Sequence, residues 1–302
     1  MNWQKSLKSK ILDSEPLSSH TTFRIGGPAE FFIRPRDIDD LERLLNSVKI
    51  YKMSFRVIGA GSNILISDRG LEGVTVSLNS PYFRNIHFRN NRVEVGAGKP
   101  LNQFIDNLKN RGLRGAEFLA GIPGTIGGAL AMNAGITWKV TSQESGVRSI
   151  ADLVETVTVM DYNGKIKNLD KKDIRFDYRS SGLSKYIILR CSLKLKKAKK
   201  KIIDKRIKEY LKVRKINQDY SHPSAGCVFK NPRGYSAGRL IDLCGLKGRR
   251  IGDAAISLKH ANFIINLGNA RASDVFKLMG LIRRTVKNKF GINLEPEIKI
   301  WK

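Results

Sequence analysis

The chain of 302 residues is long enough for two or three domains of ordinary size. Its content of 41% hydrophobic and 27% charged residues is typical of a globular protein and excludes a disordered one. The formal net charge of +28 would suit a nucleic-acid-binding protein, although a general bias toward surface lysine explains it equally well.

The cysteines indicate a reducing compartment. Cys191, Cys227 and Cys244 are odd in number and far apart, and no CxxC pair occurs. A disulfide framework is therefore not expected, and the four scattered histidines have no spacing for a metal site or a nucleophile–base pair. No signal peptide or run of about 20 apolar residues is present, so we expect a cytoplasmic protein without a membrane span.

The first 70 residues predict alternating strands and one helix. Phe23 and Ile25, then Phe31 and Ile33, alternate around a Gly-Gly-Pro turn and predict two short strands. Asp37 is placed to cap a helix with a regular apolar face. Residues 55–59 and 64–66 then predict two further strands.

A glycine-containing turn, GAGSN at 59–63, lies between those two strands. It does not open a helix and lacks the third glycine of a dinucleotide-binding fingerprint, and the chain has no P-loop pattern. If phosphates bind here, backbone amides and the side chains of Ser62 and Asn63 must hold them.

Residues 74–112 remain rich in strands and end in one helix, which Pro100 opens and Gly112 ends. A second glycine-rich stretch follows, GIPGTIGGALAMNAG at 121–135. Five glycines among small apolar residues, without charge, are poorly suited to a flexible linker. Two interpretations stay open: amides that face a flat or phosphorylated cofactor, or a close crossing of backbone against backbone.

The second half of the chain predicts a hairpin at Asn163-Gly164, a strand at 187–195 and a basic helix whose apolar positions are Ile203, Ile207 and Leu211. The lysine-rich run at 194–215 has no stacking platform of the kind that single-strand binders use, so we interpret it as a solvated helix face.

A stretch rich in Gly, Pro and Ser at 221–238 leads into the last third of the chain. It is followed by a helix around 240–244 and a strand at 262–268. A long helix capped by Ser273 and ended by Gly291 then precedes a final strand.

Five motifs in one order resemble the UDP-N-acetylenolpyruvoylglucosamine reductase family of peptidoglycan synthesis, from about Thr22 to the C-terminus. They are GAGSN, GIPGTIGGALAMNAG, DYRSSGL at 177–183, SAGCVFKNP at 224–232 and LEPEIKI at 294–300. The chain resembles the shorter type of that family, because no long segment follows DYRSS.

The resemblance implies an α+β fold. It consists of an FAD-binding part of the vanillyl-alcohol-oxidase type in two subdomains, residues 1–85 and 86–200, and a C-terminal α+β substrate-binding domain, residues 201–293. The strand at 294–302 is expected to return to the first subdomain.

The cofactors implied are bound FAD and the co-substrate NADPH, with the UDP-sugar as substrate and no metal. We expect a monomer without a specific nucleic-acid partner. The residues implied to contact FAD are Gly59, Gly61, Ser62, Asn63, Ile64, Ile122, Pro123, Gly124, Thr125, Gly127 and Gly128.

The implied reaction is reduction of an enol ether: hydride passes from flavin N5 to C3 of the substrate, and a proton is added at C2. Arg179 and Glu297 would stabilise the charge that develops on the substrate carboxylate, with Glu295 as the rival of Glu297. Arg179 could instead form a surface ion pair with Asp177 or Glu117.

The proton donor departs from the usual family pattern. The family has Ser where this chain has Cys227, and a thiol is the stronger acid. The alternative is a small buried hydrophobic residue. Tyr178, Lys230 and Asn231 are the implied substrate-binding residues.

A second departure from the family pattern is the segment 136–149, which is longer than in the family.

Two other classes of protein remain as alternatives: a different FAD oxidase on the same fold, and a basic nucleic-acid-binding protein.

Overall fold

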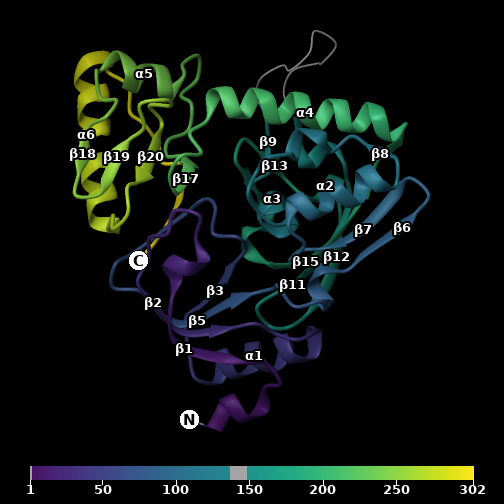
Figure 1. Cartoon of the computed structure of the whole chain (residues 1–302). Coiled ribbons are helices and arrows are strands. Elements are labelled where there is room, and N and C mark those ends of the chain that lie inside the picture. The colour runs from purple at the N-terminus through teal and green to yellow at the C-terminus, as the bar shows by residue number, and fades with distance from the viewer. Residues whose placement is uncertain (1, 137–147) are drawn as a thin grey trace. The chain divides into compact units, whose positions relative to one another are not determined.

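The computed structural model describes residues 2–136 and 148–302, in two compact units. Unit 1 contains Phe32–Ala60 and Val74–Arg214 with the N-terminal residues to Leu12, and unit 2 contains Asp13–Phe31, Gly61–Gly73 and Lys215–Lys302. Both units combine strands with helices (Figure 1), which confirms the expected α+β class. The division into three domains stays a prediction.

The first sheet has the strand order β1-β2-β5-β3. Its strands are β1 (Ile11–Pro16), β2 (Pro28–Ile33), β3 (Phe55–Ile58) and β5 (Leu71–Ser77). The helix α1 (Ile38–Ile50) begins where the Asp37 carboxylate accepts a hydrogen bond from the amide of Asp40, as the capping pattern predicts. Leu41, Leu44 and Leu45 form its buried side.

The larger sheet of unit 1 has the order β12-β11-β15-β7-β6, and all neighbours in it are antiparallel. Its strands are β6 (Ile86–Arg89), β7 (Arg92–Gly96), β11 (Val154–Met160), β12 (Ile166–Asp170) and β15 (Ile187–Lys194). The predicted hairpin at Asn163-Gly164 joins β11 to β12, and Gly164 has the positive φ of 85° that such a turn requires.

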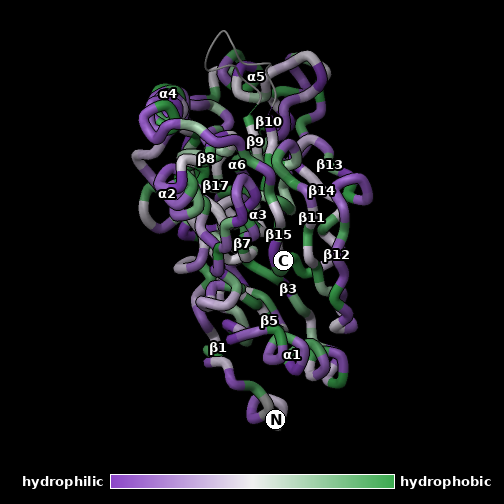
Figure 2. The backbone as a smooth tube through the Cα atoms, turned by 90° about the vertical axis from the view of Figure 1, so that its right-hand side faces the viewer, coloured by the Kyte–Doolittle hydropathy of each residue, from purple (hydrophilic) through white to green (hydrophobic). Residues whose placement is uncertain are grey.

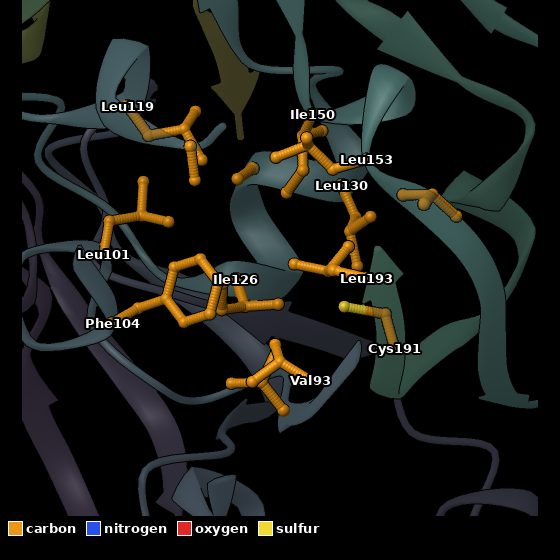
Figure 3. Close-up of a cluster of buried hydrophobic side chains, with 14 of the residues drawn as sticks. Val93, Leu101, Phe104, Leu119, Ile126, Leu130, Ile150, Leu153, Cys191 and Leu193 are labelled. Carbon is orange, nitrogen blue, oxygen red and sulfur yellow. The ribbon is translucent and has the colours of Figure 1, made fainter. Parts of the chain in front are cut away.

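Two helices cover one face of this sheet. They are α2 (Leu101–Asn110) and α3 (Ile126–Ala131). In Figure 3, Phe104 and Ile126 point toward Val93 and Leu193 of the sheet.

A third helix, α4 (Lys200–Asn217), adds Ile203, Ile207 and Tyr210 to the same core. The expected third apolar position, Leu211, is instead exposed, because the buried side of the helix runs through Tyr210.

Short antiparallel pairs complete unit 1. They are β8 (Leu113–Arg114) with β16 (Lys196–Lys197), β9 (Gly135–Ile136) with β10 (Arg148–Ser149), and β13 (Phe176–Asp177) with β14 (Ser180–Ser181). The long segment expected at 136–149 thus starts and ends in a paired strand, while its residues 137–147 lie outside the described part of the chain.

Unit 2 is built on an antiparallel sheet of order β17-β20-β19-β18. Its strands are β17 (Ser224–Cys227), β18 (Arg250–Ile251), β19 (Ala254–Ile256) and β20 (Phe263–Asn266). The helices α5 (Ala237–Leu243) and α6 (Ala272–Phe290) bury their apolar sides on it. A parallel pair joins β4 (Ile64–Ile66) to the C-terminal strand β21 (Lys299–Trp301).

The structure corrects two local predictions in unit 2. Residues 23–25 form no strand; Phe23 and Ile25 are buried directly in the core. Helix α6 is not capped by Ser273, because the Asp68 carboxylate accepts hydrogen bonds from the amides of Ala272 and Ser273 and thereby fixes an earlier start. Among the described helices, none has the length and apolar character that crossing a membrane requires.

Candidate active site

The glycine-rich stretch 121–135 is packed tightly at the start of α3. The Gly127 amide donates to the Ala97 carbonyl at 2.8 Å, and a Cβ on Gly127 would come within 3.0 Å of the Ala97 Cβ. The Ile126 amide donates to Lys99, and Gly128 donates to the Thr125 hydroxyl that caps the helix. At Gly127 the glycine therefore serves a close backbone crossing, and the first three amides of α3 are already used within the protein.

A bare surface remains just before α3. A Cβ on Gly59 would lie 2.7 Å from Oγ1 of Thr125, so the end of β3 and the glycine-rich stretch are in contact within unit 1. Gly59 and Pro123 are exposed, and Ile122 and Gly124 are half-buried. A narrow cradle of backbone and small apolar side chains fits a flat, phosphorylated cofactor such as FAD.

The rest of the GAGSN turn lies in unit 2, where it holds the C-terminal segment. Gly61 has a φ of 60° and is packed against His20, whose carbonyl oxygen would be 2.2 Å from an added Cβ. Asn63 donates from its side chain to the Glu297 carbonyl at 3.2 Å and accepts from the Lys299 amide. Ser62 and Ile64 are half-buried beside it.

The segments that carry Cys227 and Glu297 meet in unit 2, although 70 residues separate them in the sequence. Cys227 ends β17, and the Glu297 amide donates to the carbonyl of its neighbour Val228 at 2.8 Å. The two segments also meet at the bridge between Phe229 and Pro296. Both side chains are partly exposed, so each is accessible to a ligand.

The two candidate carboxyls, Glu295 and Glu297, differ in their exposure to solvent. Glu295 is 76% exposed, and its carboxylate pairs with Lys230 at 3.4 Å. Glu297 is half-buried, and the backbones of both glutamates bond to the segment that follows Cys227. The two carboxyls therefore differ in exposure, and Glu297 is the less exposed of them.

Asn262, which the sequence did not indicate, fixes the backbone near Cys227. The side chain of Asn262 is buried, with its Oδ1 accepting from the Phe229 amide and its Nδ2 donating to the Phe229 carbonyl. These two bonds fix the backbone just after Cys227. The side-chain oxygen of Asn231, a predicted substrate-binding residue, accepts from the Ala237 amide at the start of α5. Neither the contact of Asn262 with Phe229 nor that of Asn231 with Ala237 has a local sequence signal.

Arg179 lies in unit 1, in the turn between β13 and β14. Its φ of 56° is unusual for a residue with a side chain and marks a constrained position. Its guanidinium donates to the Gly135 carbonyl at 3.2 Å, at the end of the glycine-rich stretch, and lies 5.2 Å from the centre of the Tyr178 ring.

The suggested partners of Arg179 are engaged elsewhere. Asp177 pairs with Arg175 at 2.7 Å, and one oxygen of Glu117 accepts from the Gly115 amide. The structure thus places Arg179 beside the glycine-rich stretch in one unit, and Cys227 with Glu297 in the other.

A cavity of about 590 Å³ lies in unit 2. Ala255 and Ile265 form part of its floor, and Lys215, Arg250 and Lys259 contribute positive charge to its lining. Phe263, opposite Cys227, and Ile265 are two positions apart on β20, so Cys227 faces the same side of the sheet as the cavity floor. Its lining thus combines apolar side chains with three cations and the Asp219 carboxylate.

Asp219 lines the cavity and forms hydrogen bonds with two neighbouring serines. Its carboxylate accepts from the hydroxyl of Ser221 at 2.5 Å and from that of Ser257 at 2.6 Å. The ring of His222 lies 2.8 Å from the same Ser221 oxygen. Because the serine lies between the carboxylate and the imidazole, the order is unlike that of a catalytic triad. The described residues contain no cluster of three metal-binding side chains.

The Asp219 contacts predict a pH-dependent contribution to stability. Burial opposes the charged form, but the hydrogen bonds from Ser221 and Ser257 outweigh it and hold the pKa of Asp219 below its usual value. Asp219→Asn should therefore lower the free energy of unfolding at pH 7 by about 1–3 kcal/mol in urea titrations. The difference from wild type should begin to shrink below about pH 4, where Asp219 of the unfolded chain becomes protonated, and should be lost as the pH falls through the lower pKa of the folded state.

Asp242→Asn is the matched control, because the Asp242 carboxylate forms an exposed pair with Lys247. Equal stability of wild type and Asp219→Asn at pH 7 would contradict this role.

Comparison with known proteins covers both units. The FAD binding domain family matches residues 29–170, and the UDP-N-acetylenolpyruvoylglucosamine reductase C-terminal domain family matches residues 218–301. The UDP-N-acetylenolpyruvoylglucosamine reductase of Moorella thermoacetica is 40% identical over 99% of this chain and 95% of its own length. Reductase 1 of Bacillus cereus is 38% identical over 96% and 94%.

A solved structure agrees with these matches. The crystal structure of the reductase from Thermus caldophilus has a TM-score of 0.81 and 37% identity, covering 98% of this chain and 100% of that one. Similarity over nearly the full length, in sequence and in fold, shows that the chain belongs to the UDP-N-acetylenolpyruvoylglucosamine reductase family of FAD-containing oxidoreductases.

Proposed function

We propose that the chain reduces UDP-N-acetyl-enolpyruvylglucosamine to UDP-N-acetylmuramate for peptidoglycan synthesis, with NADPH as the electron source. The observation that supports the proposal is the backbone hydrogen bond from the Glu297 amide to the Val228 carbonyl, which joins the segment of Glu297 to the residue that follows Cys227. The family relationship supports the same reaction.

The residues that would hold FAD are those of the exposed cradle, Gly59, Ile122, Pro123, Gly124 and Thr125, together with Ser62 and Asn63. When bound, FAD would supply the hydride chemistry that links NADPH to C3 of the substrate. Gly127 would support the cradle through its packing on Ala97, because its amide is already bonded there.

Three side chains would act on the substrate. The Cys227 thiol donates a proton to C2, and Arg179 binds the substrate carboxylate through two parallel N–H groups. Glu297, in its neutral form, donates a further hydrogen bond to the same carboxylate. Together these donors stabilise the negative charge that hydride addition creates, and each contact of this kind contributes a few kcal/mol.

The cavity in unit 2 suits the nucleotide end of the substrate. The cations in its lining, Lys215, Arg250 and Lys259, complement a diphosphate, and Ile265 and Ala255 offer an apolar surface to a flat base. Lys230 is engaged with Glu295, so its contribution to substrate binding requires that surface pair to open.

The two glutamates of LEPEIKI form a matched pair of variants. Glu297→Gln should lower kcat by roughly 10- to 100-fold, because an amide still donates a hydrogen bond but cannot share a proton with the developing charge. Glu295→Gln removes only an exposed ion pair and should leave kcat within about twofold of wild type. Steady-state assays on both variants check this order, and the reverse order would assign the catalytic role to Glu295.

The function is tested by NADPH consumption in the presence and absence of the enolpyruvyl sugar nucleotide. We expect oxidation that depends on the sugar nucleotide, with one UDP-N-acetylmuramate formed for each NADPH. Oxidation with oxygen and an alcohol substrate, without a need for NADPH, would instead indicate a different FAD oxidase.

A further inference from the structure

Helix α4 presents a straight row of exposed lysines on the side opposite its core contacts. The row, called here the lysine ridge, has spacings of four, three and four residues, which place its members on one side of a helix. It consists of Lys201, Lys205, Lys208 and Lys212. Figure 2 shows α4 mainly in the colour of hydrophilic residues.

Acidic residues of the same helix neutralise the lysine ridge only in part. Eight basic and two acidic side chains give α4 a net charge of +6. The two carboxylates, Asp204 and Glu209, are half-buried on the sides of the helix. Asp204 pairs with Lys208 at 2.9 Å and with Lys109 at 3.8 Å. The exposed side of α4 is thus strongly positive.

Aliphatic side chains flank the ridge. Ile202 and Leu211 are 46% and 43% exposed, at positions to either side of the lysine row. The one aromatic residue of the helix, Tyr210, is buried in the core and offers no platform for stacking a nucleobase. Positive charge combined with exposed aliphatic groups suits the interface of an anionic bilayer better than a nucleic acid.

We propose that the lysine ridge docks the protein reversibly on a membrane surface rich in anionic phospholipid headgroups. The lysine ammonium groups would meet the headgroup phosphates, while Ile202 and Leu211 reach the boundary with the acyl chains. Each lysine near such a surface strengthens binding roughly fivefold, so four lysines account for an affinity that one alone would not give.

The test is co-sedimentation of the full-length, FAD-loaded protein with vesicles. One set contains phosphatidylglycerol and phosphatidylcholine in equal parts, and the other contains phosphatidylcholine alone. The ridge variant is K201Q/K205Q/K208Q/K212Q. The matched control K277Q/R283Q/R284Q/K287Q removes the same charge from exposed positions of α6. Flavin spectra and melting temperatures verify the fold of each variant.

We expect wild type and the α6 variant to bind the anionic vesicles, the ridge variant to bind at least about 100-fold more weakly, and none to bind phosphatidylcholine. Ile202→Ser with Leu211→Ser should also weaken vesicle binding. Equal losses in the ridge and α6 variants, or no binding by wild type, would overturn the proposal. Tighter, ridge-dependent binding to a DNA oligonucleotide at the same ionic strength would assign the ridge to nucleic acid instead.

Discussion

Changing Cys227 to alanine should lower kcat by about 100- to 10,000-fold, the usual contribution of a positioned general acid. The thiol lies at the end of β17, next to the segment that carries Glu297, and alanine has no proton to give. Bleaching of the flavin by NADPH should be unaffected, because that step does not need a proton at C2. Stopped-flow absorbance measures the two half-reactions separately.

Two further variants define the role of Cys227. Cys227→Ser should recover much of the rate, since a hydroxyl can also donate a proton although it is a weaker acid. Cys244→Ala is the matched control: Cys244 belongs to the same unit and is also partly buried, but it packs against the core at the end of α5. A near-normal rate for Cys227→Ala would make Cys227 a packing residue only.

Changing Arg179 to alanine should lower kcat/KM by roughly 100- to 1,000-fold, which corresponds to about 3–4 kcal/mol of lost charge stabilisation. The expected loss falls on the step that reduces the sugar nucleotide, where negative charge develops on the carboxylate. Arg179→Lys should remain impaired, because an ammonium group keeps the charge but lacks the fork of parallel donors. Steady-state kinetics with the sugar nucleotide measure both effects.

Arg175→Ala is the control for this experiment. Arg175 belongs to the same short hairpin segment, but its exposed side chain pairs with Asp177 and is not expected to affect turnover by more than about twofold. Equal effects of the Arg175 and Arg179 variants would indicate that the hairpin is merely destabilised. Unchanged kinetics for Arg179→Ala would remove Arg179 from the mechanism.

The sequence predicted those elements whose signals are local. The cap at Asp37, the Asn163-Gly164 hairpin and the stop at Gly291 each depend on a few neighbouring residues, and all three are confirmed. The predicted start of α6 was wrong because the carboxylate that binds its first amides belongs to Asp68, about 200 residues earlier in the chain. The strand expected at 23–25 failed because Phe23 and Ile25 are buried by contacts that alternation alone does not reveal.

The candidate site also contains features that local sequence patterns do not predict. Motif resemblance indicated Arg179, Cys227 and Glu297, but only the fold shows that Glu295 is exposed and paired with Lys230. The glycine-rich stretch allowed two interpretations, and the structure shows the close backbone crossing at Gly127, while the interpretation as a cofactor surface stays a prediction. Asn262 and the cavity in unit 2 depend on contacts between distant segments, which no local pattern encodes.

The central claim is that this chain uses a bound flavin to pass electrons from NADPH to an enolpyruvyl sugar nucleotide. Its most direct test is the visible spectrum of the purified protein without oxygen, recorded after NADPH and then after the sugar nucleotide is added. The account predicts a flavin band that NADPH bleaches and the sugar nucleotide restores, with one UDP-N-acetylmuramate formed per flavin. A colourless protein that does not take up FAD, or a bleached band that the sugar nucleotide leaves unchanged, would contradict it.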